Sequence, residues 1–315
     1  MKILIASKIY ADSIEKLKED HEVVCAFGAD KETLKSLIWD CDVLVFRSGV
    51  EISADVMAAA PSLKLLLRAG SGVDNLDLDY ISQRGLRLIR IPGPGAKAVA
   101  ELSFAMMLAL ARNLLEADRL TRGGRWAKNE LTGYLLTGKV LGVLGAGNIG
   151  SRVGRMGVAW GMDVLACVEH PSPERAKEFE QTGIQLTTDE EVIAKADFLS
   201  VHVPLTTSNR NLINKEALAT MRPGAYLVNL ARGGVVDEAA LFHALTEGRL
   251  GGAALDVHQA EGEGKISPLA ELKNVILTPH IGASTFDSQR EIGEIIIETV
   301  KSFKTEQSST QLETS

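Results

Sequence analysis

The sequence is poor in the features that mark several classes of protein. Its 315 residues include only three cysteines (Cys25, Cys41 and Cys167), an odd number without metal-site spacing. This favours reduced thiols in a cytoplasmic protein that holds no metal. No block of Lys and Arg stands out against a formal net charge of −7, so we expect no nucleic-acid partner. Motifs for Lys, Ser or Cys nucleophiles are absent as well.

Long apolar runs are also missing. The longest, Leu102 to Ala111, covers roughly half of a membrane span and predicts a buried helix. Met1 leads directly into a predicted strand. We therefore expect no signal peptide before the fold and no membrane partner.

What the chain does have is 45% apolar residues, ample for two cores, and a length that suits two domains. Short Val/Leu/Ile-rich runs alternate with helical stretches, which predicts buried parallel strands in an α/β fold. The first five runs, with short helices between them, indicate a flavodoxin-like module. They cover residues 1–7, 21–27, 42–48, 63–70 and 86–91.

We expect the chain to leave this module and return to it. A helix from Val99 to Arg112, apolar nearly all round, predicts burial between domains or subunits. A second βαβ series follows, and a helix over 285–303 then returns to the first module. The predicted domains are therefore 1–98 plus 285–315, and 99–284. Residues 304–315 lack an apolar period, which predicts a frayed tail.

Residues capable of chemistry follow the strands of the second series. Its aliphatic runs end on a glycine turn after Leu144, on His202, on Arg232, on Asp256 and on His280. In open α/β sheets, ligands bind beyond the carboxyl ends of the strands. The sequence therefore predicts that a glycine loop, an arginine and a histidine share one rim.

The segment VLGAGNIG (143–150) carries the pattern G-x-G-x-x-G after a predicted strand and at the start of a predicted helix. In that context Gly145 allows the tight turn, Gly147 lets backbone approach a pyrophosphate, and Gly150 lets helix and strand pack closely. The helix N-terminus offers N–H groups to the phosphates. A dinucleotide site that includes Asn148 and Ile149 is favoured over a merely structural turn, which makes the second domain a Rossmann domain inserted in a substrate-binding one.

The next strand bears on which dinucleotide binds. A carboxylate is expected near its end, about 20 residues past the loop, to hold the ribose hydroxyls. Val168 stands at that point and Glu169 follows it, so the acidic position is displaced by one. No Arg or Lys occurs at 166–170, and Glu169 would repel a 2′-phosphate. We expect NAD rather than NADP.

Three residues suit the oxidation of a hydroxyacid. His280 follows a strand, where a neutral imidazole can take the proton of a substrate hydroxyl. Glu261, in a Gly/Glu-rich loop, would orient that ring and favour its charged form, although it could also be a solvated loop charge. Arg232 offers a planar fork for a substrate carboxylate.

The other histidines are assigned lesser roles. His243 lies within a predicted helix and is expected to be structural. His202 lies at a strand end near the expected cofactor, where hydrogen bonding is favoured over catalysis. His21 and His258 carry no argument for a function.

The chain resembles the D-isomer-specific 2-hydroxyacid dehydrogenases, most closely the D-3-phosphoglycerate dehydrogenase branch. The resemblance covers nearly the whole chain and implies catalytic roles for Arg232, Glu261 and His280. It rests on FRSGVEIS (46–53), LLLRAGSGVDNLDLD (65–79), VLGAGNIG (143–150), VHVPLTTSNRNLIN (201–214), MRPGAYLVNLARGGVVDEAAL (221–241), LDVHQAEGEGKISPL (255–269) and LTPHIGAST (277–285).

The resemblance also implies two sets of binding residues. Asp256 would lie near the nicotinamide amide, and the other residues near the cofactor are Val203, Pro204, Leu230, Ala231, His280, Gly282 and Ala283. Backbone N–H groups would meet the substrate carboxylate at Ser71, Gly72 and Val73, and the branch's substrate-side cationic positions are matched by Arg47, Ser48 and Arg68.

The chain departs from the family pattern at three places. His258 and Gly262 stand where an aromatic residue and a proline are usual, which predicts a more mobile loop. Arg90 and Gly95 stand where asparagines are common, which bears on substrate identity. Val168 replaces the usual aspartate at the adenosine ribose.

The sequence thus predicts an NAD-dependent D-2-hydroxyacid dehydrogenase that forms a homodimer. D-3-phosphoglycerate is the first choice of substrate, and hydroxypyruvate or glyoxylate reduction the second. An NAD-binding corepressor of the same fold and a non-catalytic NAD sensor are the alternatives. The intact set of Arg232, Glu261 and His280 argues against the corepressor, and NADH oxidation with a panel of 2-keto acids would test for the sensor.

Overall fold

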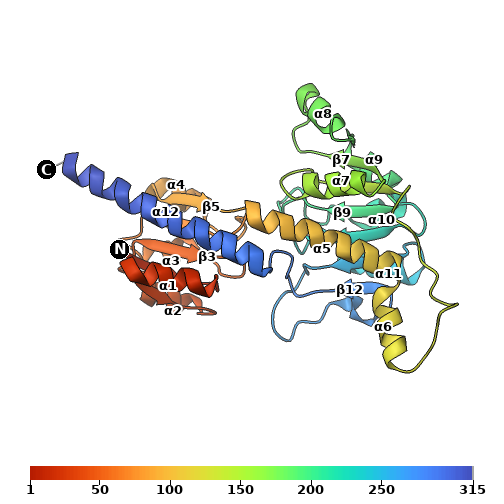
Figure 1. The fold of residues 1–315 in the computed structure, drawn as a ribbon, viewed down its shortest axis with the longest axis horizontal. Helices are drawn as coiled ribbons and strands as arrows, with labels where there is room; N and C mark the ends of the chain where they lie inside the picture. The colour runs from red at the N-terminus through yellow and green to blue at the C-terminus, as the bar shows by residue number, and fades with distance from the viewer. Residues whose placement is uncertain (314–315) are drawn as a thin grey trace. The chain divides into compact units, whose positions relative to one another are not determined.

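A computed structural model describes residues 1–313, with side chains as far as residue 307. The chain divides into two compact units (Figure 1). Unit 1 is Met1–Gly95 together with the chain from Ser284 onward, and unit 2 is Ala96–Ala283. These divisions lie slightly earlier in the chain than the expected ones after residues 98 and 284. Each unit is described by itself.

Unit 1 contains a five-stranded parallel sheet in the order β2-β1-β3-β4-β5. The predicted flavodoxin-like arrangement of five strands is confirmed. Its elements are β1 (Lys2–Ile5), α1 (Ala11–Asp20), β2 (Glu22–Cys25), α2 (Lys31–Ile38), β3 (Val43–Phe46), α3 (Ala54–Ala58), β4 (Leu65–Arg68), α4 (Leu78–Arg84), β5 (Arg87–Arg90) and α12 (Phe286–Glu313).

Alternate residues of these strands face opposite sides of the sheet, and each side is covered by helices. Leu4, Leu44 and Leu66 pack with residues of α2, α3 and α4. On the other side, Ile3 and Val43 pack with residues of α1 and α12. The central strands β1, β3 and β4 are buried on both sides apart from Lys2, which is why they read as aliphatic runs.

The helix α12 packs on the part of unit 1 formed by residues 1–95, although it is almost 200 residues away in the sequence. Figure 1 shows α12, in blue, beside α1, and the two helices pack together. The helix continues to Glu313. The predicted helix end at residue 303 is therefore wrong, and so is the predicted frayed tail over residues 304–313. Neither Gly nor Pro occurs after Phe303 to stop the helix. Residues 314 and 315 lie outside the described part of the chain.

Unit 2 contains a seven-stranded parallel sheet in the order β12-β11-β10-β9-β6-β7-β8. The strand order reverses between β6 and β9, which is the crevice where open α/β sheets bind ligands. Its elements are α5 (Gly93–Ala111), α6 (Leu114–Arg122), β6 (Val140–Leu144), α7 (Gly150–Ala159), β7 (Asp163–Cys167), α8 (Pro173–Glu180), β8 (Ile184–Leu186), α9 (Asp189–Lys195), β9 (Phe198–Val201), α10 (Lys215–Thr220), β10 (Tyr226–Asn229), α11 (Glu238–Thr246), β11 (Gly252–Leu255), a 3-10 turn (Pro268–Glu271) and β12 (Val275–Leu277).

Helices cover both faces of this sheet as well. One core joins Val143 and Val228 of the strands to Phe104 and Met107 of α5. The helix α5 is long and apolar enough to cross a membrane, but 67% of its apolar window is buried inside the protein, as in a core helix. It begins at Gly93, earlier than predicted, because Pro94 is well tolerated in the first turn of a helix.

One helix was not predicted. The helix α6 (Leu114–Arg122) has no buried residue. Its sequence therefore lacks the apolar stripe facing a core by which the other helices were predicted. Pairs of Arg122 with Asp118 and of Arg119 with Glu116, one turn apart, support it.

The close packing of α12 on α1 can be tested at Gly293. A Cβ on Gly293 would overlap the hydroxyl of Ser13 and approach its Cβ to 2.8 Å. Gly293→Ala should therefore lower the free energy of unfolding of unit 1 by about 1–3 kcal/mol through overpacking. Urea denaturation measures this, with the neighbouring exposed Glu294→Ala as control. Equal stability of the two variants would contradict the packing of α12 described above.

Candidate active site

The predicted site residues of unit 2 follow the carboxyl ends of its strands, at one edge of the sheet. All seven strands are parallel, so their following loops meet at the same edge. The glycine loop follows β6 and Val168 follows β7. After β9, β10, β11 and β12 come, in that order, His202 to Pro204, Leu230 to Arg232, Asp256, and Thr278 to Ala283.

The glycine loop fits a dinucleotide. Gly145 has φ +93°, a conformation that L side chains rarely adopt, and a Cβ there would lie 2.8 Å from Val203. A Cβ on Gly150 would overlap the carbonyl oxygen of Gly145. Around Gly147, by contrast, the space is open. The first turn of α7 has no side-chain cap, so its N–H groups suit a pyrophosphate.

A cavity of about 480 Å³ opens beside this loop, between α7 and α8. Arg155 and Arg175 line it together with Glu174 and Glu178. The expectation about charge at the ribose end rested on residues 166–170 alone, and these four residues were not predicted. No sequence motif marks charged residues that lie one or two helical turns beyond a loop as neighbours of the ligand site. Val168 itself is half-buried and packs against the core, and Glu169 is exposed.

The central pair of the site is Glu261 and His280. The Nδ1 atom of His280 lies 2.9 Å from Oε2 of Glu261. Partial burial alone would raise the pKa of the Glu261 carboxyl, but the hydrogen bond and charge of His280, aided by the amide of His258, hold that pKa below its ordinary value. An ionised carboxylate only accepts hydrogen bonds, so Nδ1 carries the proton and Nε2 of the neutral ring is left with a lone pair.

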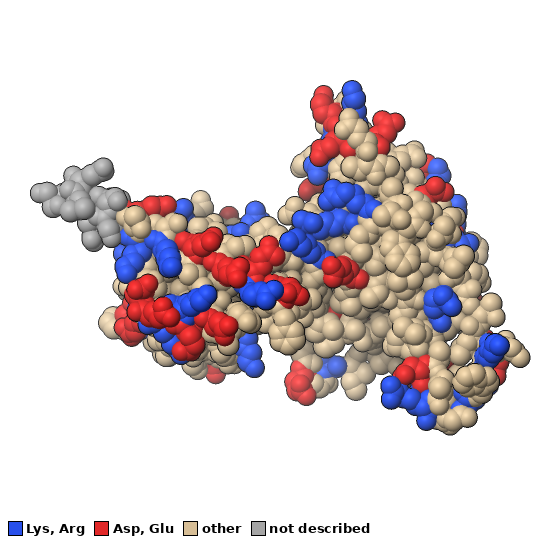
Figure 2. Space-filling view, in the orientation of Figure 1, with Lys and Arg blue, Asp and Glu red and all other residues tan. Residues whose placement is uncertain are grey.

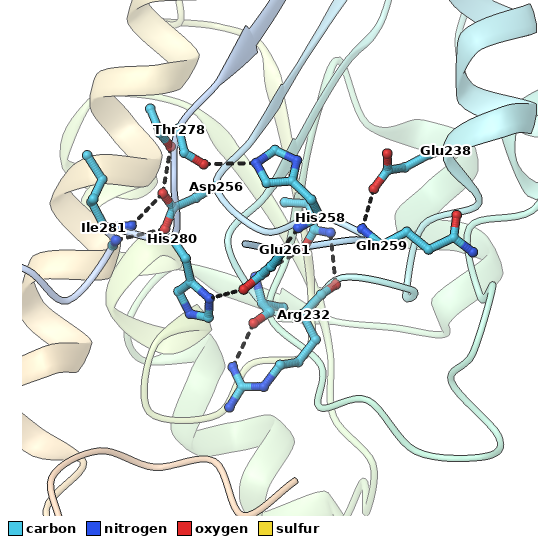
Figure 3. A network of polar contacts seen from close by, with 12 residues as sticks. Arg232, Glu238, Asp256, His258, Gln259, Glu261, Thr278, His280 and Ile281 are labelled. Atoms are coloured by element: carbon cyan, nitrogen blue, oxygen red, sulfur yellow. Dashed lines mark hydrogen bonds and ion pairs between the residues drawn. The ribbon is translucent and has the colours of Figure 1, made fainter. Parts of the chain in front are cut away.

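The backbone of the loop with Arg232 packs closely against the backbone of the loop that carries Glu261. A Cβ on Gly233 would overlap the carbonyl oxygen of His258, so only glycine allows this approach. The half-buried Arg232 donates from Nη1 to the carbonyl of Ala231 at 2.7 Å. Figure 3 shows its guanidinium below the Glu261–His280 pair. The three predicted catalytic residues thus come from neighbouring loops.

The backbone of His280 is held in an unusual conformation. Its φ is +54°, in the left-handed region that few residues other than glycine adopt. The carboxylate of Asp256, 1% exposed, accepts hydrogen bonds from the Thr278 hydroxyl (2.6 Å) and from the amides of Ile281 (2.8 Å) and Gly282 (2.7 Å) (Figure 3). Both carboxylate oxygens of Asp256 are therefore engaged by the turn that presents His280.

A residue without an assigned role, His258, also joins this network. Its Nε2 donates to the carbonyl of Thr278 at 2.9 Å, and its amide donates to Oε1 of Glu261 at 3.1 Å. The loop that contains Gly262 is thereby tied to the end of β12. No spacing or periodicity in the sequence signals this contact, because it joins two loops 20 residues apart.

His202 is held neutral at the end of β9. Its Nε2 lies 2.8 Å from the hydroxyl of Ser200, and its Nδ1 is buried with no hydrogen-bond partner among the described residues. Burial lowers the pKa of His202 to about 3. The backbone carbonyl of His202 lies beside Gly145 of the glycine loop, and the neutral ring adds no charge at this strand end.

Unit 1 contains the residues expected to bind substrate. Arg68 is 3% exposed, and its guanidinium donates to the carbonyls of Gly72 (3.0 Å) and Ala69 (3.3 Å). It therefore shapes the loop of Ser71 to Val73 rather than facing solvent. The loop of Arg47 and Ser48 is joined to this one by Asn75, which donates to the carbonyls of Arg47 and Val50. Burial lowers the pKa of the Arg47 guanidinium.

The neutral state of His202 leads to a prediction about stability and pH. As pH falls below 6.5, the ordinary value, the unfolded chain binds a proton that the folded protein refuses until about pH 3. Stability is therefore lost with falling pH, by about 2 kcal/mol at pH 5. His202→Gln should show a correspondingly weaker dependence of its unfolding free energy on pH between 7 and 5. The exposed His243→Gln is the control; equal slopes in all three proteins would contradict a neutral His202.

Comparison with known proteins agrees with this arrangement. Residues 104–282 match the D-isomer specific 2-hydroxyacid dehydrogenase, NAD binding domain. Over 96% of its length the chain is 42% identical to a D-3-phosphoglycerate dehydrogenase of Methanocaldococcus jannaschii, but it spans only 57% of that relative. It is 38% identical to a hydroxypyruvate reductase of Thermotoga maritima, covering 90% of this chain and 91% of the relative.

A solved structure gives the same answer. The D-lactate dehydrogenase of Aquifex aeolicus, complexed with NAD and lactic acid, superposes with a TM-score of 0.84 at 28% identity, covering 97% of this chain and 96% of that one. The predicted resemblance is confirmed, and so is an NAD-binding Rossmann domain. The chain belongs to the family of D-isomer-specific 2-hydroxyacid dehydrogenases.

Proposed function

We propose that this protein is an NAD-dependent dehydrogenase that interconverts a D-2-hydroxyacid and its 2-keto acid. The observation that carries the proposal is the 2.9 Å contact between Glu261 and His280, beside the Arg232 loop and on the same sheet edge as the glycine loop. NAD, when bound, accepts hydride from C2 of the hydroxyacid or returns it to the keto acid. Asn148, Ile149 and the glycines of the loop would hold its pyrophosphate.

His280 is assigned the proton transfer. In the oxidation direction its Nε2 removes the hydroxyl proton while the C2–O bond becomes a carbonyl and the C2 hydrogen leaves with its electron pair. The imidazolium so formed is stabilised by Glu261, which stays ionised because its pKa is depressed. In the reduction direction the same nitrogen returns the proton to the oxygen.

Arg232 is assigned the substrate carboxylate. Its guanidinium presents several donors in a rigid fork, and one of them is already fixed by the carbonyl of Ala231. That bond sets the direction of the fork and lowers the entropy lost when a carboxylate binds. The amides of Ser71, Gly72 and Val73 are proposed as further carboxylate donors.

A panel of 2-keto acids with NADH tests the proposal. We expect the absorbance of NADH to fall with at least one of glyoxylate, pyruvate, hydroxypyruvate and 3-phosphohydroxypyruvate. His280→Asn should lower kcat by about 10²–10⁴-fold through loss of acid–base catalysis, while NADH binding measured by fluorescence should stay unchanged. Asparagine tolerates the left-handed backbone at this position, so the fold is preserved.

Two outcomes would count against the proposal. NADH binding without turnover of any acid would favour a corepressor or sensor of the same fold. Full activity of His280→Asn would remove His280 from the proton transfer. The exposed His243→Gln serves as the control for a histidine outside the site.

Two substrate classes have support. D-3-phosphoglycerate is proposed first, because the D-3-phosphoglycerate dehydrogenase of M. jannaschii is 42% identical. Reduction of hydroxypyruvate or glyoxylate is the second candidate. It is favoured by the burial of Arg68 among carbonyls of its own loop, which leaves one cation fewer for a phosphate, and by the length match to the hydroxypyruvate reductase.

Arg47 distinguishes these substrates. If its guanidinium receives a phosphate, Arg47→Ala should raise KM for 3-phosphoglycerate roughly tenfold to hundredfold, as loss of a charge-assisted hydrogen bond costs about 1.5–3 kcal/mol. KM for an unphosphorylated hydroxyacid should change little. Arg87→Ala, at the opposite end of the strands and paired with Glu306, is the matched control. Equal losses on both substrates would favour hydroxypyruvate or glyoxylate.

A homodimer in the cytoplasm is proposed as the working state. The segment from Leu114 to Leu135 exposes Leu114, Leu115, Trp126, Tyr134 and Leu135, with Trp126 82% exposed. Large apolar side chains gathered on one segment mark an interaction surface. Elsewhere on the face in Figure 2, acidic and basic side chains are interspersed.

A further inference from the structure

The buried carboxylate of Glu238 has no part in the proposed proton transfer, yet its hydrogen-bond partners lie in the loop that carries Glu261. Glu238 is 3% exposed in the first turn of α11. That helix is already capped by Asp237, which accepts from the amides of Ala239 and Ala240. Among the described residues Glu238 has no ion-pair partner. A buried carboxylate without a cation is costly unless its oxygens are fully hydrogen-bonded.

Both oxygens of Glu238 are used, and both partners belong to the loop of Glu261. Oε1 accepts from the amide of Gln259 at 2.5 Å, and Oε2 accepts from the hydroxyl of Ser267 at 2.8 Å. Ser267 in turn caps the 3-10 turn by accepting from the amide of Leu269. Glu238 thus ties together the two ends of the segment 260–266.

The segment between these ends has little support of its own. Ala260 to Ile266 is exposed throughout, and Gly262 and Gly264 adopt positive φ. Two successive amides at its start point to two different carboxylates. The amide of His258 donates to Glu261, and the amide of Gln259 donates to Glu238. Fixing one of these peptide planes therefore constrains the other (Figure 3).

We propose that Glu238 is a positioning residue that holds Glu261 within hydrogen-bond distance of His280. The inference rests on the proposed function, because it assigns the pair its use, but the geometry of the pair is measurable without turnover. Loss of the Glu238 carboxylate removes the hydrogen bonds from the Gln259 amide and from the Ser267 hydroxyl. The two ends of the segment 260–266 are then no longer held together. The 2.9 Å contact between Glu261 and His280 then lengthens on average.

The test compares Glu238→Ala with Glu238→Gln, whose amide oxygen still accepts from Gln259. Glu247→Ala, which removes an exposed carboxylate at the opposite end of the same helix, is the control. The first readout is the Nδ1–H proton resonance of His280 in histidine-labelled protein, assigned with His280→Asn. We expect the strongly hydrogen-bonded resonance in the wild type, Glu238→Gln and Glu247→Ala, and its loss in Glu238→Ala and Glu261→Ala.

The second readout is the pH profile of kcat/KM with the best acid of the panel. Glu238→Ala should lose about 10- to 100-fold, as expected for misplacement of a catalytic pair. The pH at which kcat/KM falls on the acidic side of the profile should shift in Glu238→Ala as it does in Glu261→Ala. The affinity of Glu238→Ala for NADH should stay unchanged. Glu238→Gln should retain most of the activity.

The outcomes separate this inference from the proposed function. If no acid is turned over, the resonance alone decides whether Glu238 positions the pair. An intact resonance and wild-type pH profile in a folded Glu238→Ala would overturn the inference and leave Glu238 as a stabilising residue. If Glu238→Ala does not fold, Ser267→Ala, which removes one of the two bonds, takes its place with the same criteria.

Discussion

The parallel direction of all seven strands of unit 2 is the constraint on which the site depends. A parallel sheet sends every strand end to the same edge, so Gly145 and His280, distant in sequence, follow strands at one rim. The reversal of strand order between β6 and β9 separates the loops there and leaves room for the cofactor. An antiparallel strand anywhere between β9 and β12 would have moved a residue of the set to the opposite edge.

Three carboxylates of the site share one chemistry but differ in environment. Asp256 and Glu238 are buried, and their oxygens are taken up by amides and hydroxyls of the loops around them. Such groups organise backbone and are unavailable to a ligand. The side chain of Glu261 is 40% exposed and has the imidazole of His280 as a partner. The buried pair fixes the backbone of the loops, and the more exposed Glu261 is the one that contacts the imidazole.

The sequence predicted what depends on local pattern. Aliphatic runs located the strands of both sheets except β8, and the spacing of Gly145, Gly147 and Gly150 located the turn between β6 and α7. Contacts between loops were not predictable. The bonds of Glu238 to Gln259 and of His258 to Thr278 join segments about 20 residues apart, and no periodicity connects them. The burial of Arg68 was missed for a related reason, since an arginine at a strand end reads as exposed until its carbonyl partners are seen.

The discontinuity of unit 1 has a consequence for the order in which the chain matures. Ile296 and Val300 of α12 are fully buried against the sheet formed by the first strands, whereas unit 2 lies wholly between these two pieces of sequence. During synthesis unit 2 can close its core before α12 emerges from the ribosome, and domains fold as units in this way. The strands translated before unit 2 must wait, with part of one apolar face uncovered, for a helix translated after unit 2. Until that helix is made, the strands of unit 1 are the part of the nascent chain most exposed to aggregation.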